Sequence, residues 1–447
     1  MRTIKLLDSP TTIRIEQMKK IIGQIIALTK NIYLNSPDGT QNGMEQFFVG
    51  KRDPFQFSGG IGISWWYTKF TYKTVENLSF LINSDLKEFS GCDHETIQSV
   101  IRDTLHEICV DRNIFNGDLV CFCGKDTIFE CRSETDANKF GGYILDAVLE
   151  NIRKSISLRC VIYSAPRITG KSFTIDSEKI HVIHKSDSEK WSELVELGYY
   201  FREWDPVTGN FIDGHNSAFS GKDYDYVFAT ETEGTNQGNK FTASLKFRKL
   251  FSVISALIEY KYRFKVMARP YSMCMQIPHE KSQDKSFTQN EIGELYPYYG
   301  SDLEINDEHI SRIRQWYREE QELTDEQRNR IEKCAHFINK GMNSSDIESY
   351  IHYFVALDAL YGKIGSVSKS IEQGVSCLPD SSHWNKKISW LFDLRNELVH
   401  GGSRYIEEWP KYMRYYRHFS AEPARDIEKL ALHALASAPS LFHESNK

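Results

Sequence analysis

The feature that most constrains the fold is a series of capped, amphipathic segments beyond residue 306. The segment 307–321 opens with an acidic first turn, which suits the positive end of a helix dipole. Thr324 and Gln327 have the spacing of a capping box, which predicts the start of a second helix. The next two predicted helices end at Gly341 and Gly362. Further helices are predicted over 368–374, 383–400 and 421–438. Short connections between them favour an antiparallel bundle.

The first 300 residues mix helical periodicity with short β-rich runs. The predicted helices span 13–33, 94–110, 136–155 and 241–262. The predicted strands span 158–163, 179–183 and 264–277, and 40–75 has the pattern of strands and loops. Polar residues over 278–300, with two prolines, indicate a linker. The expected fold class is therefore α+β: a mixed α/β region over 1–300, with a subdivision near 156, and an all-α bundle over 301–447.

Bulk composition excludes several classes of protein. The net charge of -6 at pH 7 excludes a general nucleic-acid coating protein, whose surface would be strongly basic. Residues 1–17 lack the apolar region of a signal peptide, and no window approaches the roughly eighteen apolar residues of a membrane span. The nine cysteines are scattered and odd in number, as is typical of reduced thiols. We therefore expect a cytoplasmic protein without membrane contact, bound metal or cofactor.

Residues 388–402 form the most informative stretch of the chain. An apolar stripe on this predicted helix should face the bundle core and consists of Leu391, Leu394 and Leu398. Asn396 and His400 are four residues apart and share another face, and Arg395 lies about 100° from Asn396 around the axis. Gly401 and Gly402 predict the end of the helix, which places His400 in the last turn, where the helix dipole favours its protonated form.

These residue types suit RNA cleavage without a metal. The 2′-hydroxyl of RNA can attack the adjacent phosphate and leave a 2′,3′-cyclic phosphate and a 5′-hydroxyl. A histidine such as His400 can move the protons, since imidazole titrates near neutral pH. Arg395 can hold the phosphate and stabilise the charge that builds on it, and Asn396 can orient either side chain. DNA lacks the attacking hydroxyl and would not be cut by this route.

Local charge around the motif also favours RNA. Residues 385–418 carry a net charge of +3 from Lys, Arg, Asp and Glu. The candidate RNA-binding residues are Lys386, Lys387, Arg404, Lys411 and Arg414. Aromatic residues interleave with these charges, as at many single-stranded RNA sites: Tyr405, Trp409, Tyr412, Tyr415 and Tyr416.

The C-terminal part resembles the HEPN superfamily, and within it the ApeA-like HEPN domains of bacterial anti-phage defence proteins. The resemblance covers roughly 305–440 and rests on two pieces. Asp393-Leu-Arg-Asn-Glu-Leu-Val-His-Gly401 is similar to the family's LRN-x-x-x-HG active helix. Phe354-Val-Ala-Leu-Asp-Ala-Leu-Tyr-Gly362 is similar to its upstream ALE-x-L helix.

The resemblance implies a homodimeric endoribonuclease in which two R-x4-H helices face each other and form one composite site. Carried over by position, Arg395, Asn396 and His400 would be catalytic. Asp358 would be a supporting acid in place of the usual glutamate, and a helix-surface or capping role fits it equally well. Gly402 stands where some HEPN toxins have a tyrosine that becomes nucleotidylated, so that regulation is not expected. By analogy alone, the region 1–300 would sense a phage-derived trigger and restrain the nuclease.

Two other functional interpretations stay open. The bundle could be a non-catalytic module that binds a nucleotide, RNA or a protein. The stretch from Ala165 to Ser172, with Lys171, matches a relaxed P-loop pattern, although a strand-like run follows it. A zinc site at Cys121, Cys123 and Cys131 is less well supported than alternation along a strand. His181 and His184 have a spacing that puts their rings on opposite faces of a strand, which disfavours chelation.

Overall fold

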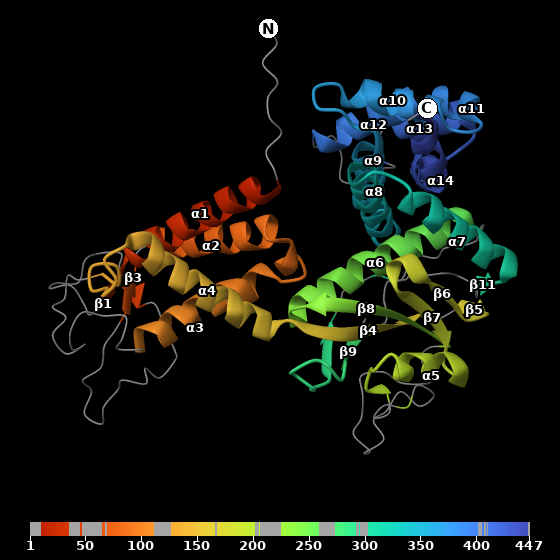
Figure 1. The fold of residues 1–447 in the computed structure, drawn as a ribbon. Coiled ribbons are helices and arrows are strands. Elements are labelled where there is room, and N and C mark those ends of the chain that lie inside the picture. Colours follow the sequence, from red (N-terminus) through yellow and green to blue (C-terminus); the bar gives the residue numbers. More distant parts are fainter. Residues whose placement is uncertain are drawn as a thin grey trace, which may run out of the picture. The chain divides into compact units, whose positions relative to one another are not determined.

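The computed structural model describes residues 10–34, 45–46, 65–67, 69–110, 127–165, 168–201, 205, 225–258, 273–291, 295, 303–400, 405, 408 and 410–445. They divide into two compact units (Figure 1). Unit 1 comprises Met1–Ser157 with Glu233–Asn239, and unit 2 comprises Leu158–Thr232 with Lys240–Lys447. The fold is α+β, as expected from the sequence. Unit 2 contains both the main sheet and the C-terminal helices, so the sequence-based boundary at 300 lies inside it.

Unit 1 is built on helices that pack around one apolar core. They are α1 (Pro10–Thr29), α2 (Lys69–Asp85), α3 (His94–Val110) and α4 (Ala137–Ser155). A small antiparallel sheet joins β1 (Ile32–Leu34), β3 (Trp65–Tyr67) and β2 (Glu45–Gln46). Helix α4 begins where predicted because the Asp136 carboxylate accepts from the backbone amides of Asn138 and Lys139.

Two predictions for unit 1 need correction. Helix α2 falls partly within 40–75, where the sequence analysis expected strands and loops. The buried side chains of Val75, Leu78 and Ile82 recur at helical spacing, so a helix is what buries them together. The helix predicted over 13–33 ends at Thr29, and Ile32–Leu34 pairs with β3. Ile32 thereby reaches the core from a strand.

The sheet of unit 2 has the strand order β10-β9-β4-β8-β7-β6. Its strands are β4 (Ser157–Ala165), β6 (Phe173–Ile175), β7 (Ile180–His184), β8 (Tyr226–Gly234), β9 (Met273–Pro278) and β10 (Thr288–Glu291). The pairs β10–β9, β9–β4, β8–β7 and β7–β6 are antiparallel. A parallel pair, β5 (Ile168–Gly170) with β11 (Leu303–Ile305), lies outside this sheet. Strand β10 lies within the expected linker over 278–300, so that part is a sheet edge.

Both faces of this sheet are covered by helices (Figure 1). Along β4, Val161 and Tyr163 belong to the core shared with α6 (Asn236–Leu257). Cys160 and Ile162 belong to the opposite core, which α5 (Ser188–Glu196) covers with Trp191 and Leu194. The alternation follows from the two-residue period of a strand. Helix α5 lies between strand signals and was not predicted from the sequence.

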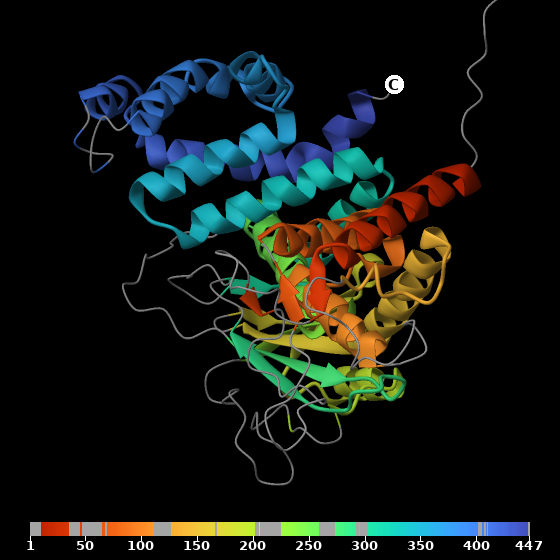
Figure 2. The ribbon, with the colours of Figure 1, turned by 90° about the vertical axis from the view of Figure 1, so that its left-hand side faces the viewer.

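The C-terminal helices follow β11 without a long interruption. They are α7 (Asp307–Gln321), α8 (Asp325–Asn343), α9 (Asp346–Tyr361), α10 (Val367–Ser376), α11 (Ser381–Asn385), α12 (Ile388–Val399), α13 (Pro410–Phe419) and α14 (Pro423–Ser445). The Thr324 capping box is confirmed, and Asn306 with His309 forms a second one at the start of α7. Figure 2 shows α8 and α9 side by side, and α14 contacts both.

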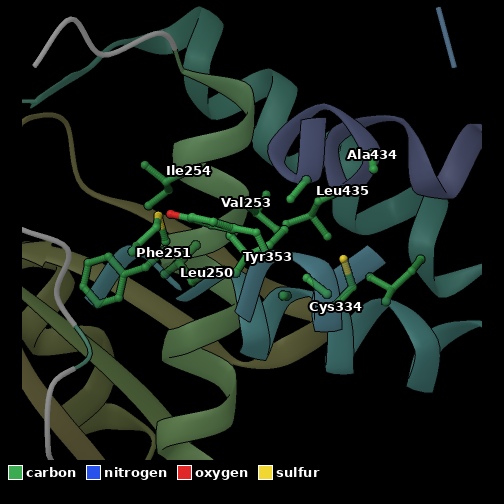
Figure 3. Close-up of a cluster of buried hydrophobic side chains, with 14 of the residues drawn as sticks. Leu250, Phe251, Val253, Ile254, Cys334, Tyr353, Ala434 and Leu435 are labelled. Carbon is green, nitrogen blue, oxygen red and sulfur yellow. The ribbon is translucent and has the colours of Figure 1, made fainter. Parts of the chain in front are cut away.

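Helix α6 lies in the core of the C-terminal helices as well as on the sheet. Its apolar side chains meet Cys334 of α8, Tyr353 of α9 and Leu435 of α14 (Figure 3). The ammonium of Lys249 forms ion pairs with Glu178 at 2.7 Å and Glu320 at 2.8 Å. Burial alone lowers the pKa of Lys249, but these two carboxylates hold it above its usual value. Lys249 therefore joins the sheet side of unit 2 to α7.

Gly341 has a different role from the predicted one. Helix α8 continues past it to Asn343. A Cβ on Gly341 would lie 2.8 Å from the Tyr353 ring, so glycine allows α8 and α9 to approach closely. The hydroxyl of Ser349 donates to the Gly341 carbonyl at 2.7 Å. Packing against α9, which the local sequence does not reveal, therefore explains this glycine.

A proline inside α14 leaves one backbone carbonyl without its usual helical donor, and a side chain of α7 donates to it instead. Pro439 has no amide hydrogen, so the Leu435 carbonyl one turn earlier loses its usual helical donor. The indole Nε1–H of Trp316 donates to that carbonyl at 3.1 Å, in a buried contact.

No described helix in either unit is long and apolar enough to cross a membrane.

We predict that Trp316→Phe lowers the free energy of unfolding by about 1–3 kcal/mol, because the buried Leu435 carbonyl loses its donor. Denaturant titration measures the loss. In a Pro439→Ala background, residue 439 regains an amide that can serve the same carbonyl, so Trp316→Phe should then cost less. An equal cost in both backgrounds would contradict this account.

Candidate active site

Helix α12 carries the predicted motif, and its apolar stripe is buried as expected. Leu391, Leu394 and Leu398 belong to the core of unit 2. The phenolic hydroxyl of Tyr350, from α9, donates to the Leu391 carbonyl at 2.9 Å. That carbonyl lies one helical turn before Arg395, so α9 fixes α12 next to the motif.

A buried polar cluster holds the start of α12. The Lys387 ammonium lies 2.7 Å from an Asp426 carboxylate oxygen, and both side chains are 7% exposed. The Tyr415 hydroxyl donates to the same oxygen at 2.8 Å. Burial and then the hydrogen bond to Asp426 raise the pKa of Tyr415 well above its usual value. The cluster links α12, α13 and α14 through complementary charge.

Lys387 therefore needs correction as an RNA-binding candidate. Its ammonium is buried, is paired with Asp426 and lies 5.7 Å from the ring centre of Trp384 and 5.6 Å from that of Phe419. A phosphate could reach it only by displacing a buried carboxylate, which is costly. Its role in this structure is to anchor the helix.

Arg395 and Asn396 lie together at the surface of α12. The Arg395 guanidinium donates to the Asn396 side-chain oxygen at 3.3 Å. Arg395 is half-buried and Asn396 is exposed. Because guanidinium has five N–H donors, a single bond to Asn396 leaves others that can meet an anion. The hydrogen bond places the Asn396 amide where it could orient the arginine, and that role stays a prediction.

His400 lies at the C-cap of α12, with φ of -90° and ψ of 9°. Its backbone amide donates to the Asn396 and Leu398 carbonyls, and its side chain is exposed. Gly401 and Gly402 lie outside the described residues. Five residues of helix rise by about 7 Å, and the described structure records no hydrogen bond between Arg395 and His400. One α12 helix therefore presents the two groups at its surface without joining them.

Asp358 lies in the last turn of α9 and is exposed. Its carbonyl accepts from the Gly362 amide at 2.7 Å. A Cβ on Gly362 would overlap the Asp358 carboxylate, so this side chain folds over the helix end. Within the described part of the chain, the structure records no ion pair between Asp358 and Arg395 or His400. This position fits the helix-end role more closely than the supporting acid.

The remaining cationic candidates have varied surroundings. Lys386 is exposed, and Arg404 lies outside the described residues. The Lys411 ammonium pairs with Glu397 at 2.7 Å, and this hydrogen bond raises the pKa of Lys411. The Arg414 guanidinium lies 5.4 Å from the ring centre of Trp390, and its side chain is exposed. Lys386 and Arg414 are thus the described candidates best placed for a phosphate.

The aromatic residues near the motif separate into buried and exposed groups. Tyr412 and Tyr415 are core residues, which corrects their predicted place among surface aromatics. Tyr405 and Tyr416 are exposed, and Trp409 lies outside the described residues. The helical spacing of α13, which the sequence analysis did not predict, turns Tyr412 and Tyr415 inward and Tyr416 outward.

The P-loop interpretation is wrong. Lys171 and Ser172 lie between strands β5 and β6, whereas a P-loop leads into a helix whose N-terminus holds phosphate. The Lys171 ammonium pairs with Asp307 at 2.6 Å, and the Ser172 hydroxyl accepts from the His184 amide at 3.0 Å. Both side chains therefore take part in contacts within unit 2.

The described residues contain no cluster of three or more His, Cys, Asp or Glu that could hold a metal ion. Cys121 and Cys123 lie outside these residues, and Cys131 is buried in the core of unit 1. His181 and His184 lie on strand β7, as predicted. They meet different partners, Glu231 at 3.7 Å and Ser186 at 2.7 Å, so they form no common site.

No protein-family model, curated protein or solved structure matches the chain. What the site can do chemically therefore follows from the chain's own residues.

We predict that Lys387→Met lowers the free energy of unfolding by about 3–5 kcal/mol, because Asp426 becomes a buried charge without its cation. Thermal or denaturant unfolding measures the change. The double variant Lys387→Met/Asp426→Asn removes that charge as well and should recover part of the loss. If Lys387→Met unfolds like the wild type, the buried pair does not hold α12.

Proposed function

We propose that this protein is a metal-independent endoribonuclease of the HEPN type. The observation that carries the proposal is the surface end of α12, where the Arg395 guanidinium donates to Asn396 and the exposed His400 is the C-cap. The contacts of Tyr350 and Lys387 hold this helix in the bundle. The motif thus stands on a rigid element, as a catalytic group requires.

The proposed reaction uses the RNA's own 2′-hydroxyl. The hydroxyl loses its proton, its oxygen bonds to the adjacent phosphorus, and the bond from phosphorus to the 5′ oxygen breaks. The departing 5′ oxygen takes up a proton, so the products are a 2′,3′-cyclic phosphate and a 5′-hydroxyl. His400 would transfer protons, and Arg395 would stabilise the charge on the phosphate oxygens. Asn396 would position the guanidinium through the observed hydrogen bond.

The reaction needs Arg395 and His400 at one phosphate, and a second copy of the chain can supply that. Along one helix the two groups are about 7 Å apart in rise, and they do not hydrogen-bond to each other. Two α12 helices that face each other would place Arg395 of one copy near His400 of the other. We therefore propose a homodimer formed through the C-terminal helices.

We further propose that the protein is a cytoplasmic effector of anti-phage defence. In this proposal, the region 1–300 binds a phage-derived trigger and restrains the nuclease until infection. The support is the resemblance of the C-terminal sequence to ApeA-like HEPN domains. RNA is the proposed substrate, and the reaction calls for no metal or cofactor.

We predict that Arg395→Ala and His400→Ala each reduce RNA cleavage at least about a hundredfold, since each removes a group needed in the transition state. The wild type and the variants would be expressed in a bacterial host, with and without phage. Total RNA would then be mapped for new 5′-hydroxyl ends. Arg395→Lys should stay impaired, because lysine cannot form the bidentate contact of arginine.

Arg425→Ala is a matched control, since Arg425 is an exposed arginine of α14 whose recorded partner is Glu422. It should cleave and protect like the wild type. If the wild type and Arg395→Ala/His400→Ala behave alike under challenge and RNA stays whole, the nuclease proposal is wrong. Salt-dependent RNA binding without cleavage would instead indicate a binding module.

A further inference from the structure

A stacked aromatic and cationic cluster lies beside the motif, between α12 and α13. The rings of Trp390 and His418 are nearly parallel, with an interplanar angle of 9° and centres 5.0 Å apart. Arg414, one turn before His418 on α13, places its guanidinium 5.4 Å from the centre of the same indole. We refer to Trp390, Arg414 and His418 as the stacked cluster.

Two members of the stacked cluster are exposed to solvent. One face of the His418 imidazole covers the indole of Trp390, so its other face points away from the indole. His418 and Arg414 are both exposed, and Trp390 is half-buried. Phe419 meets Trp390 edge-on, with centres 5.4 Å apart at 79°. Phe419 also meets the His418 ring edge-on, with centres 4.6 Å apart at 88°. Phe419 thus supports both stacked rings, and the exposed His418 can present a flat surface to solvent.

The charges around the cluster favour binding of a single-stranded nucleic acid. Asp393 and Glu397 lie near it on α12, and Lys411 pairs with Glu397 at 2.7 Å. That pair neutralises one of the two acids. Arg414 and the exposed Arg417 add positive charge on α13. Aromatic faces next to guanidinium groups are the combination that holds single-stranded nucleic acid by stacking and phosphate contact.

We propose that the stacked cluster is a nucleobase-binding subsite for single-stranded RNA, with the base stacked on the outer face of His418. The inference rests on the proposed function, because it names how that nuclease holds its substrate. Trp390 precedes Arg395 on α12 by five residues, a rise of about 7 Å along the axis. Five residues also turn about 140° around the axis, so a base on His418 and a phosphate at Arg395 would belong to different nucleotides of one strand. Arg414 would contact the backbone of the same strand.

Base stacking predicts a specific pattern of RNA affinities. The full-length variant Arg395→Ala/His400→Ala serves as the parent, so that RNA is not cut during the measurement. A fluorescently labelled single-stranded RNA of mixed sequence is titrated with it, and anisotropy reports the affinity. His418→Ala in this parent should weaken binding by about fivefold to a hundredfold, the usual effect of losing one stacked base. His418→Phe should restore most of the affinity, because it retains a flat ring.

An abasic RNA separates stacking from charge. The parent should bind an oligonucleotide without bases more weakly than the normal RNA. His418→Ala should lose little further affinity for the abasic RNA, since there is no base to stack. Arg414→Ala should weaken binding to both RNAs, because it loses a phosphate contact.

His383→Ala is the matched control. His383 is also an exposed histidine beside a tryptophan, but its ring is nearly perpendicular to that of Trp384, at 84°. This control should bind RNA like the parent. Circular dichroism should show an unchanged fold for both histidine variants, since both side chains are exposed.

Any of three results would overturn the subsite. The parent does not bind RNA, His418→Ala binds the normal RNA as tightly as the parent does, or the parent binds normal and abasic RNA equally tightly. The outcome is separable from the nuclease proposal. If His418→Ala weakens RNA binding but the wild type does not cleave RNA, the subsite is supported and the nuclease proposal is wrong. If the wild type cleaves RNA and cleavage does not depend on His418, the nuclease proposal stands and the subsite is wrong.

Discussion

The burial of α6 is the constraint on which unit 2 depends. One side of the helix covers the sheet, where Phe251 stacks on Phe228 with ring centres 4.8 Å apart. Other apolar residues of α6 enter the core of α8, α9 and α14 (Figure 3). Apolar burial of this kind is the main favourable term in folding. A polar contact adds specificity, since the Arg248 guanidinium donates to the Asn339 side-chain oxygen at 2.6 Å. The C-terminal helices are thereby built onto the sheet.

The candidate site is held in place by its contacts with this core. Tyr350 reaches α12 from the buried helix α9, and Asp426 reaches Lys387 from α14. Both contacts are buried, so solvent does not compete with them. The exposed groups Arg395, Asn396 and His400 stand on a helix whose other side is fixed. This arrangement, a rigid support with polar groups at its surface, is what the proposed chemistry requires.

Much of the site could be predicted because its signals are local. The stripe of Leu391, Leu394 and Leu398 follows from spacing within two turns. Outside the site, the Thr324 cap and the bounds of α3 were predicted from equally local signals. The sequence could not show that Lys387 is buried, because its partner Asp426 lies 39 residues away. The same limit hid the stacking of Trp390 on His418. Packing between distant segments decides such positions.

The domain boundary expected at residue 300 reflects the same limit of local sequence signals. A polar stretch with two prolines is typical of a linker, yet Thr288–Glu291 within it forms β10. Its pairing with β9 is a contact between strands that residue types alone do not specify. The core that joins α6 to the later helices likewise depends on long-range packing. Local signals therefore located many of the helices, though not α2, α5 or α13, and did not show which helices share a core.

The most direct test of the composite site is complementation between two inactive chains. Arg395→Ala and His400→Ala would be prepared separately and then co-expressed, and RNA would be mapped for 5′-hydroxyl ends. A mixed dimer retains one intact Arg395 and one intact His400, on different copies. We predict that cleavage, absent with either variant alone, returns in the co-expressed pair. If the pair stays as inactive as each variant alone while mixed dimers form, the site does not combine Arg395 and His400 from two copies.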